Sequence, residues 1–210
     1  MKIALFGGSG KTGQIFIQKA VDAGHNVQAL IRAPLQREGL SKLSARWVEG
    51  NALDIAAVRA TLAGQDCAIS FLGNFNRKPN SEVSDATKTI LLGLQEAGIR
   101  RFVVISTIGT GDSFKPMKSL PFKIIIKTVA RNIWKDREQQ EAVVKASNTD
   151  WTIIRPAGLR DEGDATVYQV SPSNGPFPKT LTIPRAAVAT FGLQALGDTT
   201  LIQKTVCQFT

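Results

Sequence analysis

The fold of this chain is decided close to its first residue, by the stretch Lys2-Ile3-Ala4-Leu5-Phe6-Gly7-Gly8-Ser9-Gly10-Lys11-Thr12-Gly13. The apolar run over residues 3–6 predicts a buried strand, and the glycines after it predict a tight turn into a helix over residues 11–23. Gly8, Gly10 and Gly13 have the spacing G-x-G-x-x-G, while Gly7, Gly10 and Gly13 have the related spacing G-x-x-G-x-x-G. Between a strand and a helix, this spacing lets the backbone approach a pyrophosphate at the helix N-terminus. The stretch therefore predicts a dinucleotide-binding turn of the Rossmann type.

The turn also supplies side chains that can bind phosphate oxygens, since Ser9, Lys11 and Thr12 carry two hydroxyls and an ammonium group. Its end, Gly10-Lys11-Thr12, matches the end of the triphosphate-binding P-loop, whose pattern places another glycine five residues before Gly10. That position is Leu5, inside the predicted strand, so the loop would be too short to wrap a triphosphate. A dinucleotide is therefore favoured, and a glycine turn without a ligand is the plainer alternative.

Beyond the turn, apolar runs alternate with helical patterns along the chain. Continuous apolar strands separated by helices are typical of a parallel sheet covered on both faces. We predict an α/β fold with a single Rossmann-type, doubly wound parallel sheet that has helices on both faces. One domain would span residues 1–210, with its substrate side contributed mainly by residues 107–135 and 156–185. Further strands are expected at residues 27–31, 46–48, 67–72, 102–105 and 151–154, helices at 54–62, 82–97, 122–146 and 184–196, and irregular chain elsewhere after residue 157.

The end of the second predicted strand indicates which dinucleotide is bound. An acidic side chain there accepts hydrogen bonds from a free ribose 2′-hydroxyl, whereas arginine suits a 2′-phosphate. This chain has Arg32 at that place and Arg37 in the following loop. We therefore predict NADP(H) as the cofactor, with a solvated surface charge as the alternative for Arg32.

The carboxyl ends of the fifth and sixth predicted strands hold the candidate chemistry, because ligands of doubly wound folds bind at that edge. Ser106 and Thr107 follow the fifth strand, and Pro156-Ala157-Gly158-Leu159 follow the sixth. Either hydroxyl is a candidate catalytic group that could bind the carboxamide of a nicotinamide or orient a substrate. The alternative is that each hydroxyl only caps the end of its strand.

Two other kinds of chemistry find no support. Short-chain dehydrogenases usually use the pair Tyr-x-x-x-Lys, but the single tyrosine, Tyr168, has Pro172 four residues later. The single histidine, His25, lies in a predicted turn, and with two distant cysteines it makes a metal site improbable. We therefore predict no metal.

Composition points to an ordinary globular protein, with 43% hydrophobic and 20% charged residues. The two cysteines indicate no disulfide framework, and neither a signal peptide nor a membrane-spanning run is recognised, so we expect a cytoplasmic, preferably monomeric protein. The formal charge of +9 favours polyanionic partners. Nucleic acid ranks last among these partners, because no recognised reading motif accompanies the charge.

The basic charge is concentrated between Ser113 and Trp134, where five cations and no carboxylate occur among large apolar residues. We expect a lid or rim beside the site that attracts a planar, anionic substrate. A core helix with a solvated basic face is the plainer alternative, and weak contact with an anionic membrane surface is a third.

Several motifs occur along the chain: residues 7–13, Arg32, Gly50-Asn51, Phe71-Leu72-Gly73, residues 104–107 and residues 150–156. Together, and over nearly the whole chain, these motifs resemble the NmrA-like, NAD(P)H-binding group of atypical short-chain dehydrogenases. Length and layout are most similar to the flavin reductase/biliverdin-IXβ reductase family, which lacks the tyrosine-lysine pair.

The resemblance implies roles for further residues. Asn51 and Ala52 would lie at the adenine, and Leu72-Gly73-Asn74 along the cofactor. Thr107 would lie beside the nicotinamide, where the family carries a serine. This chain departs from the family at Asn51, where aspartate is usual, and at Gly158, where the reductase has a histidine; the second departure puts the substrate in doubt.

The sequence as a whole therefore predicts an NADPH-dependent reductase. It would transfer a hydride to a planar conjugated acceptor such as a flavin, a biliverdin-type tetrapyrrole or a quinone, while solvent supplies the proton. The alternative is a non-catalytic, NADP(H)-binding redox sensor of the NmrA-like type.

Overall fold

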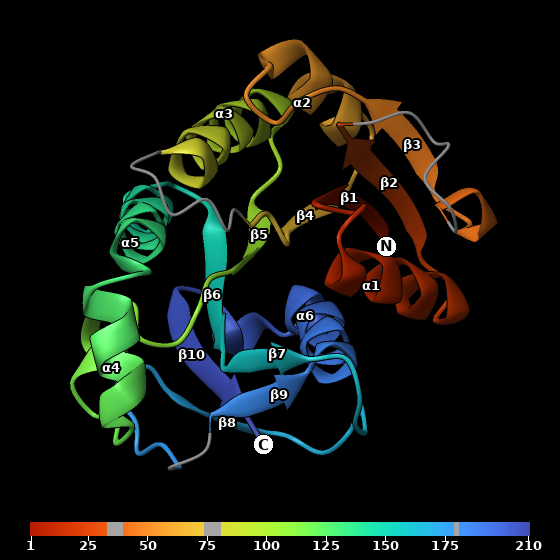
Figure 1. The fold of residues 1–210 in the computed structure, drawn as a ribbon. Coiled ribbons are helices and arrows are strands. Elements are labelled where there is room, and N and C mark those ends of the chain that lie inside the picture. Colours follow the sequence, from red (N-terminus) through yellow and green to blue (C-terminus); the bar gives the residue numbers. More distant parts are fainter. Residues whose placement is uncertain (33–39, 74–80, 179–180) are drawn as a thin grey trace.

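The computed structural model describes residues 1–32, 40–73, 81–178 and 181–210. Within them the chain builds an eight-stranded sheet in which neighbouring strands are parallel, except that β8 runs antiparallel to β10 (Figure 1). The strand order confirms the predicted doubly wound topology. In that order the strands are β3 (Arg46–Glu49), β2 (Asn26–Ile31), β1 (Lys2–Phe6), β4 (Cys67–Ser70), β5 (Arg101–Ile105), β6 (Asp150–Pro156), β10 (Lys204–Phe209) and β8 (Gln169–Pro172).

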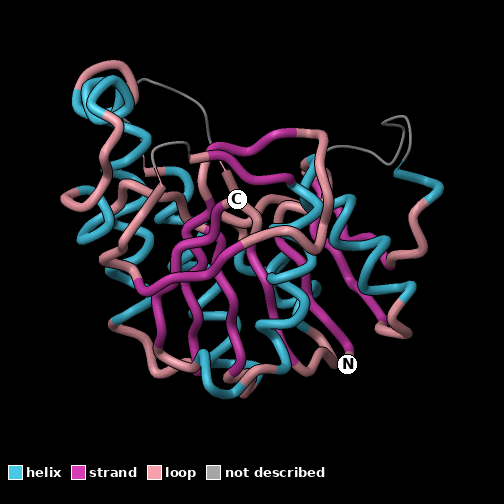
Figure 2. The backbone as a smooth tube through the Cα atoms, turned by 90° about the horizontal axis from the view of Figure 1, so that it is seen from below, coloured by secondary structure: helices cyan, strands magenta, loops and turns pink. Residues whose placement is uncertain are grey.

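Helices cover both faces of the sheet, as Figure 2 shows from a second direction. α1 (Lys11–Asp22) and α6 (Arg185–Gly197) pack together on one face. The other face holds α2 (Ile55–Leu62), α3 (Glu82–Ala97) and α5 (Arg131–Lys145). The remaining elements are α4 (Leu120–Lys127), a small parallel pair of β7 (Gly158–Arg160) and β9 (Thr182–Pro184), and three short 3-10 turns at Leu40–Lys42, Gly111–Phe114 and Thr199–Leu201.

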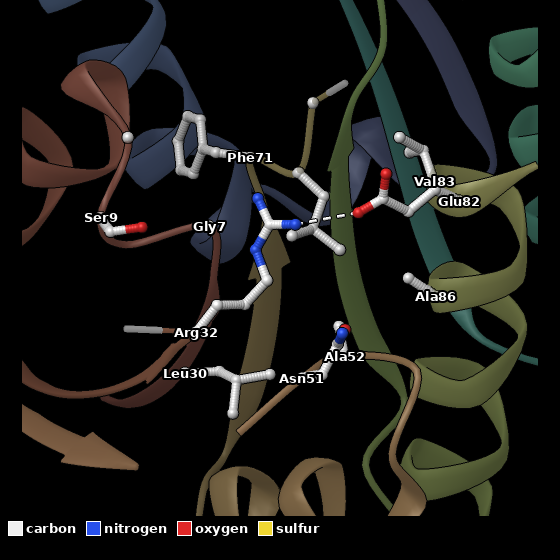
Figure 3. Close-up of a pocket in the computed structure, with 13 residues that line it drawn as sticks. Gly7, Ser9, Leu30, Arg32, Asn51, Ala52, Phe71, Glu82, Val83 and Ala86 are labelled. Carbon is white, nitrogen blue, oxygen red and sulfur yellow. Dashed lines mark hydrogen bonds and ion pairs between the residues drawn. The ribbon is translucent and has the colours of Figure 1, made fainter. Parts of the chain in front are cut away.

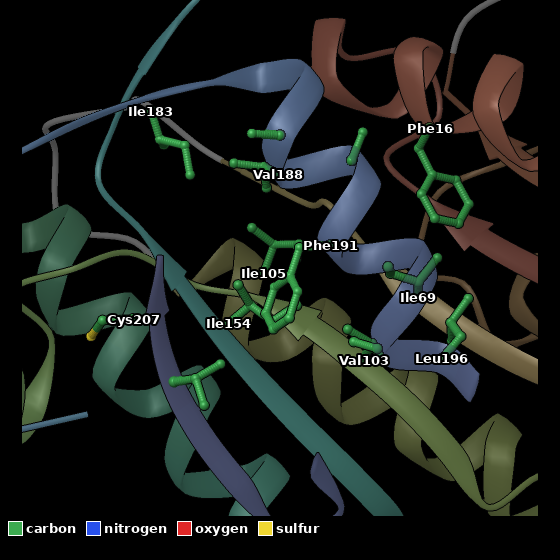
Figure 4. Packing of buried hydrophobic residues seen from close by; sticks show 14 of the residues in the cluster. Phe16, Ile69, Val103, Ile105, Ile154, Ile183, Val188, Phe191, Leu196 and Cys207 are labelled. Carbon is green, nitrogen blue, oxygen red and sulfur yellow. The ribbon is translucent and has the colours of Figure 1, made fainter. Parts of the chain in front are cut away.

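The alternation of side chains in β1 explains the two layers. Ile3 and Leu5 belong to the apolar cluster under α1 and α6, part of which is drawn in Figure 4. Ala4 and Phe6 belong to the cluster under α2, α3 and α5. Since successive residues of a strand point to opposite faces, an unbroken apolar run is what a strand covered on both sides requires.

Helix ends follow the local signals of the sequence. The Asp54 carboxylate accepts a 2.9 Å hydrogen bond from the Ala56 N–H and caps α2. Gly98 ends α3 in the left-handed conformation, with φ of +68°. These caps fix where each helix meets the strand beside it.

The single helix predicted over residues 122–146 is wrong, because the chain forms two helices, α4 and α5. The helical conformation ends at Thr128, whose φ and ψ are −113° and −87°. Thr128 also turns its hydroxyl back onto the Ile124 carbonyl oxygen at 2.7 Å, a local bond that competes with the regular helix. The break directs α4 away from the sheet, while α5 packs against α3.

The irregular chain predicted after residue 157 is also wrong, since β10 and β8 extend the sheet there. β10 carries polar residues, and Gln208 is fully buried with its amide donating to the Ala187 carbonyl oxygen at 3.0 Å. A buried glutamine interrupts the apolar pattern, which is why the strand is not recognisable by hydropathy. The strand bounds that differ by two residues are the end of β4, at Ser70 instead of residue 72, and the end of β6, at Pro156 instead of residue 154.

Both cysteines, Cys67 and Cys207, are buried and unbridged. Among the helices of the described ranges, none is long and apolar enough to cross a membrane.

Candidate functional site

The glycine turn between β1 and α1 has the backbone geometry that its spacing requires. The Gly10 N–H donates to the Gly7 carbonyl oxygen at 3.1 Å, and Gly7 has φ of +87°. A Cβ at Gly13 would lie 2.3 Å from the Gly7 oxygen, so close packing of helix and strand excludes any side chain there. A Cβ at Gly10 would meet only that oxygen, at 3.4 Å, and otherwise open space. The turn is therefore closed around Gly13 and open at Gly10, where a pyrophosphate could lie against the backbone.

A first pocket, with a volume of about 210 Å³, opens beside this turn. The end of β2, the turn before α2, the end of β4 and the start of α3 form its walls (Figure 3). It brings together most of the residues expected at the adenosine half of the cofactor. From the predicted set it contains Gly7, Ser9, Gly10, Arg32, Asn51, Ala52, Leu72 and Gly73.

Arg32 does not point freely into solvent. Its Nη1 donates to Glu82 Oε1 at 2.9 Å across the pocket, as Figure 3 shows. The Arg32 and Glu82 side chains are 64% and 40% exposed, so the pair is open to water and weak by itself. Glu82 was not predicted as a site residue; its position as the first residue of a helix that follows a strand end was the available signal. The first pocket therefore has both a cation and a carboxylate in its lining.

A second, larger pocket of about 480 Å³ continues from the first. The two share Gly7, Gly10 and the segment Phe71-Leu72-Gly73, so together they form one elongated site along the carboxyl edge of the sheet. Besides the shared residues, the second pocket contains these residues of the predicted set: Lys11, Thr12, Gly13, Ser106, Thr107, Pro156, Ala157, Gly158 and Leu159. Arg37 and Asn74, also predicted for the cofactor, lie outside the described residues.

The two candidate hydroxyls differ in what they contact. Ser106 is buried, and its Oγ donates to Glu141 Oε1 at 2.7 Å. Thr107 is half-buried, and among the described residues its Oγ1 makes only a long 3.5 Å contact to the Ile108 carbonyl oxygen. Of the two, Thr107 therefore has the hydroxyl that can turn to a ligand in the second pocket, whereas Ser106 is held by the protein.

Glu141 belongs to a buried ionic cluster behind Ser106. Arg155 donates to both carboxylate oxygens of Glu141, through Nε at 2.8 Å and Nη2 at 2.6 Å. Arg155 also donates through Nη1 to Asp112 at 2.5 Å. The Arg155 and Glu141 side chains are 1% and 4% exposed. Although burial opposes charge, these carboxylates raise the pKa of Arg155 overall, and the cluster connects β6, α5 and the turn after β5 directly beneath the site.

Arg137 is a site residue that the sequence did not reveal. It reaches the second pocket from α5, and its Nη1 donates to the Gln140 side-chain oxygen at 2.8 Å and to the Ile105 carbonyl oxygen at 3.3 Å. Burial lowers its pKa to about 10, which leaves it cationic at neutral pH. No carboxylate of the described residues forms an ion pair with it. The pocket thus presents a half-buried positive charge that is favoured by nearby Asp136 and Glu141 but is paired directly with no carboxylate of the described part of the chain.

The outer wall of the second pocket is aromatic. Phe122 of α4 packs edge-on against Trp134 of α5, with ring centroids 5.9 Å apart at 82°. The Trp134 indole N–H donates to the Ile108 carbonyl oxygen at 3.2 Å. The basic segment therefore does border the pocket, through these two rings.

A carboxylate links the glycine turn to the chain after β7. Asp161 accepts from Lys11 Nζ at 2.6 Å and from Arg185 Nε at 2.6 Å. Hydrogen bonds from Lys11 and then Arg185 lower the pKa of Asp161, whose side chain is 56% exposed. Lys11 and Arg185 both line the second pocket, so its mouth is positive but partly neutralised.

The two residues rejected as catalysts lie elsewhere. The Tyr168 hydroxyl donates to the Gln194 side-chain oxygen at 2.7 Å, and His25 Nδ1 lies 3.2 Å from the chain's amino group. Neither lines a described pocket. Among the described residues no cluster of His, Cys, Asp and Glu suits a metal ion.

Comparison with known proteins identifies the fold of the site. A family described as NAD(P)H-binding matches residues 7–199. The UPF0659 protein C216.03 of Schizosaccharomyces pombe is 29% identical over 176 residues, or 75% of this chain and 70% of that protein. The uncharacterized sugar epimerase YhfK of Bacillus subtilis is 28% identical over 178 residues, or 80% of this chain and 77% of that protein.

Solved structures agree with the fold over the whole chain. ChuY of Escherichia coli O157:H7, titled an anaerobilin reductase, is 25% identical with a TM-score of 0.80, covering 100% of this chain and 97% of that one. A short-chain dehydrogenase/reductase of Veillonella parvula in complex with NADP is 16% identical with a TM-score of 0.78, covering 100% of this chain and 94% of that one. At such low identity, the second likeness concerns the fold.

Proposed function

The chain belongs to the NAD(P)H-binding family, and from that premise we propose that it is an NADPH-dependent reductase acting on a planar, conjugated, anionic acceptor. The observation that carries the proposal is the single elongated site. A first part at the glycine turn, which gathers the residues expected at the adenosine half of a dinucleotide, continues into a larger part with aromatic walls and an arginine. Such a site can hold a cofactor and a flat substrate end to end.

The residues present fit a nicotinamide dinucleotide. The open backbone at Gly10 leaves room for the pyrophosphate, and the free N–H groups at the start of α1 face the same space. Asn51 and Ala52 would lie at the adenine, and Thr107 within reach of the carboxamide. When bound, the cofactor supplies the hydride, so the chain itself has to bind, orient and exclude water.

The choice of NADPH rests on Arg32 at the end of β2. A guanidinium at this place can bind a 2′-phosphate through two hydrogen bonds. Glu82 opposes this choice, because its carboxylate would repel the phosphate while it holds Arg32. We expect Arg32 to leave Glu82 for the dianionic phosphate, since that contact is stronger than an exposed carboxylate pair.

The acceptor class follows from the second pocket. Phe122 and Trp134 offer faces and edges to a conjugated ring, and Arg137 offers a positive charge to a carboxylate or phosphate of the acceptor. The described lining of this pocket contains no Asp, Glu, His, Cys or Tyr. Hydride transfer to an electron-poor ring suits this lining, because water can provide the proton.

The names of the relatives point in two directions. Similarity to the anaerobilin reductase ChuY supports a tetrapyrrole among the acceptors, whereas the activity of a sugar epimerase would require acid–base chemistry on a sugar carbon. Epimerisation finds less support here, because the lone tyrosine is bonded to Gln194 outside the pocket. A tetrapyrrole, a flavin and a quinone therefore head the panel of acceptors to be tested.

The test mixes purified protein with NADPH or NADH and follows the nicotinamide absorbance with flavin mononucleotide, a biliverdin and a quinone as separate acceptors. We expect NADPH to be oxidised with at least one acceptor, and Arg32→Asp to remove the preference for NADPH over NADH. Arg59→Asp, at an exposed arginine on α2, is the matched control. NADPH binding without oxidation by any acceptor would contradict the reductase and favour a redox sensor.

A variant of Arg137 tests the acceptor end of the site. Arg137→Met should raise KM for acceptors that carry a carboxylate or phosphate and leave KM for an uncharged quinone nearly unchanged. Equal effects on charged and uncharged acceptors would contradict the assignment of Arg137 to the anionic group.

A further inference from the structure

α4 exposes apolar side chains that the plainer interpretation of the basic segment would bury. Leu120, Ile124, Ile125 and Val129 are 67%, 55%, 46% and 49% exposed. Residues four apart lie on one side of a helix, so Leu120 and Ile124 form one row on α4. Ile125 follows Ile124 in the last turn of α4, and Val129 lies in the short connection to α5. We call these four residues the α4 face. Contiguous exposed apolar surface of this kind marks an interaction site.

The helix is poorly covered by the rest of the protein. Of the residues of α4, only Ile126 is buried, and Phe122 is half-buried against Trp134. Figure 1 shows α4 at the edge of the molecule, away from the sheet and leading into the start of α5. A core helix with a solvated basic face is therefore the wrong description, because here the apolar side is the solvated one.

The sequence segment that contains the α4 face carries several cations and no carboxylate. Between Ser113 and Trp134 the sequence has no Asp or Glu. None of the cations there has a carboxylate partner among the described residues. They are Lys115, Lys118, Lys123, Lys127 and Arg131.

Two of these cations are held in place beside the face. Lys123 and Lys127 lie over the Phe114 ring, with their ammonium nitrogens 5.4 and 5.3 Å from its centroid. Lys123 also donates to the Lys115 carbonyl oxygen at 2.9 Å. The positive charge is thus a fixed part of the surface from which the apolar side chains project.

We propose that the α4 face docks on the surface of an anionic lipid bilayer. The apolar side chains would enter the boundary between headgroups and acyl chains, and the surrounding cations would contact the lipid phosphates. A second copy of this chain is a poor occupant, because it would bring two cationic faces together. An uncharged bilayer would leave the cations without counter-charges. The inference concerns the surface of α4 and does not depend on the reductase chemistry.

The experiment measures sedimentation of the purified protein with vesicles of phosphatidylcholine alone or of phosphatidylcholine mixed with phosphatidylglycerol. We expect binding to the anionic vesicles only, decreasing as salt is added. Ile124→Ser should lower the binding constant about tenfold, since it removes most of a large exposed apolar side chain from the contact. Leu92→Ser is the matched control, at a leucine that is 49% exposed on α3, and should leave binding unchanged.

Two double variants test whether the cations around the α4 face contribute to lipid binding. Lys118→Gln/Lys127→Gln should weaken binding and flatten its salt dependence, whereas Lys42→Gln/Lys204→Gln, at two exposed lysines elsewhere, should not. Thermal unfolding of each variant shows that the fold is kept. Equal binding to both kinds of vesicle, no binding to anionic vesicles, or equal loss in Ile124→Ser and Leu92→Ser would each overturn the proposal. A dimer that Ile124→Ser dissociates, with no vesicle binding, would assign the face to a second copy instead.

Discussion

Arg32 and Glu82 are the two charged side chains that line the first pocket, and we propose that their competition decides between NADP(H) and NAD(H). The sequence pointed to Arg32 because it ends an apolar strand. It gave no sign of Glu82, which lies fifty residues away and meets Arg32 only because the end of β2 and the start of α3 lie at the same edge of the sheet. Pairings of this kind depend on tertiary structure and cannot be found from local pattern.

Glu82→Gln should strengthen NADPH binding by about three- to fivefold, because it removes a carboxylate that holds Arg32 and repels the 2′-phosphate. NADH binding should change little. Calorimetric titration of both dinucleotides measures the difference, with Glu96→Gln, at an exposed pair with Arg59, as control. If NADH binding is lost and NADPH binding is unchanged, Glu82 accepts the ribose hydroxyls and the cofactor is NADH.

Ser106 and Thr107 are neighbours, but we expect Thr107 to act on the cofactor and Ser106 to stabilise the fold. Thr107→Val should lower kcat with the best acceptor about tenfold at unchanged stability, because it removes the hydroxyl that can orient the nicotinamide. Ser106→Ala should instead lower the free energy of unfolding by about 1–2 kcal/mol, because Glu141 loses a buried hydrogen bond. Turnover and urea unfolding of both variants test this. A larger loss of kcat in Ser106→Ala would reverse the assignment.

Among the elements, the buried cluster of Arg155, Glu141 and Asp112 fixes α5 against the end of β6. Glu141→Gln should destabilise the protein by about 3 kcal/mol, because it leaves Arg155 buried with only the exposed Asp112 as a charged partner. Glu96→Gln, which breaks an exposed pair, should cost less than about 1 kcal/mol. Urea unfolding compares the two, and equal losses would contradict the structural role of the cluster.

Acid should weaken the same cluster at its exposed end. Burial raises the pKa of Asp112, but hydrogen bonds from Ser173 and Arg155 and the nearby positive charge lower it overall. A carboxyl whose folded pKa is depressed stabilises the fold above its unfolded pKa, and this contribution disappears as pH falls through the folded value. Asp112→Asn should therefore flatten the loss of stability on the acid side.

The elements that the sequence predicted well are those with a local cause. Asp54 marks the start of α2 and Gly98 marks the end of α3, because each cap involves only neighbouring residues. The sequence did not predict the break at Thr128, because the break depends on how α4 is directed away from the sheet. It did not predict the strand around Gln208 either, because that strand holds a buried amide hydrogen bond to Ala187. Arg137 was missed for the same reason, as its place in the pocket depends on how α5 packs.

For the whole molecule, the alternation of strands and helices was enough to predict the doubly wound sheet, because parallel strands with crossover helices leave few topologies open. The same alternation was enough to predict that the described site residues lie at one edge of the sheet, since the carboxyl ends of parallel strands meet there. The exposure of the α4 face could not be predicted, because the same pattern suits a buried helix. Through Phe122 and Trp134 that face adjoins the second pocket, so docking on a bilayer would place the acceptor end of the site near the lipid surface.

The central claim, that a dinucleotide pyrophosphate lies against the glycine turn, is tested most directly by calorimetric titration of NADPH into Gly10→Ala. The turn tolerates a methyl group there, since the nearest atom of the described residues would be the Gly7 oxygen at 3.4 Å, yet the methyl would fill the space that the pyrophosphate needs. We predict an unchanged melting temperature and an affinity at least about tenfold lower than wild type. Gly197→Ala, a glycine with no atom of the described residues near its added Cβ, should bind NADPH as wild type does. Wild-type affinity in Gly10→Ala would contradict the account.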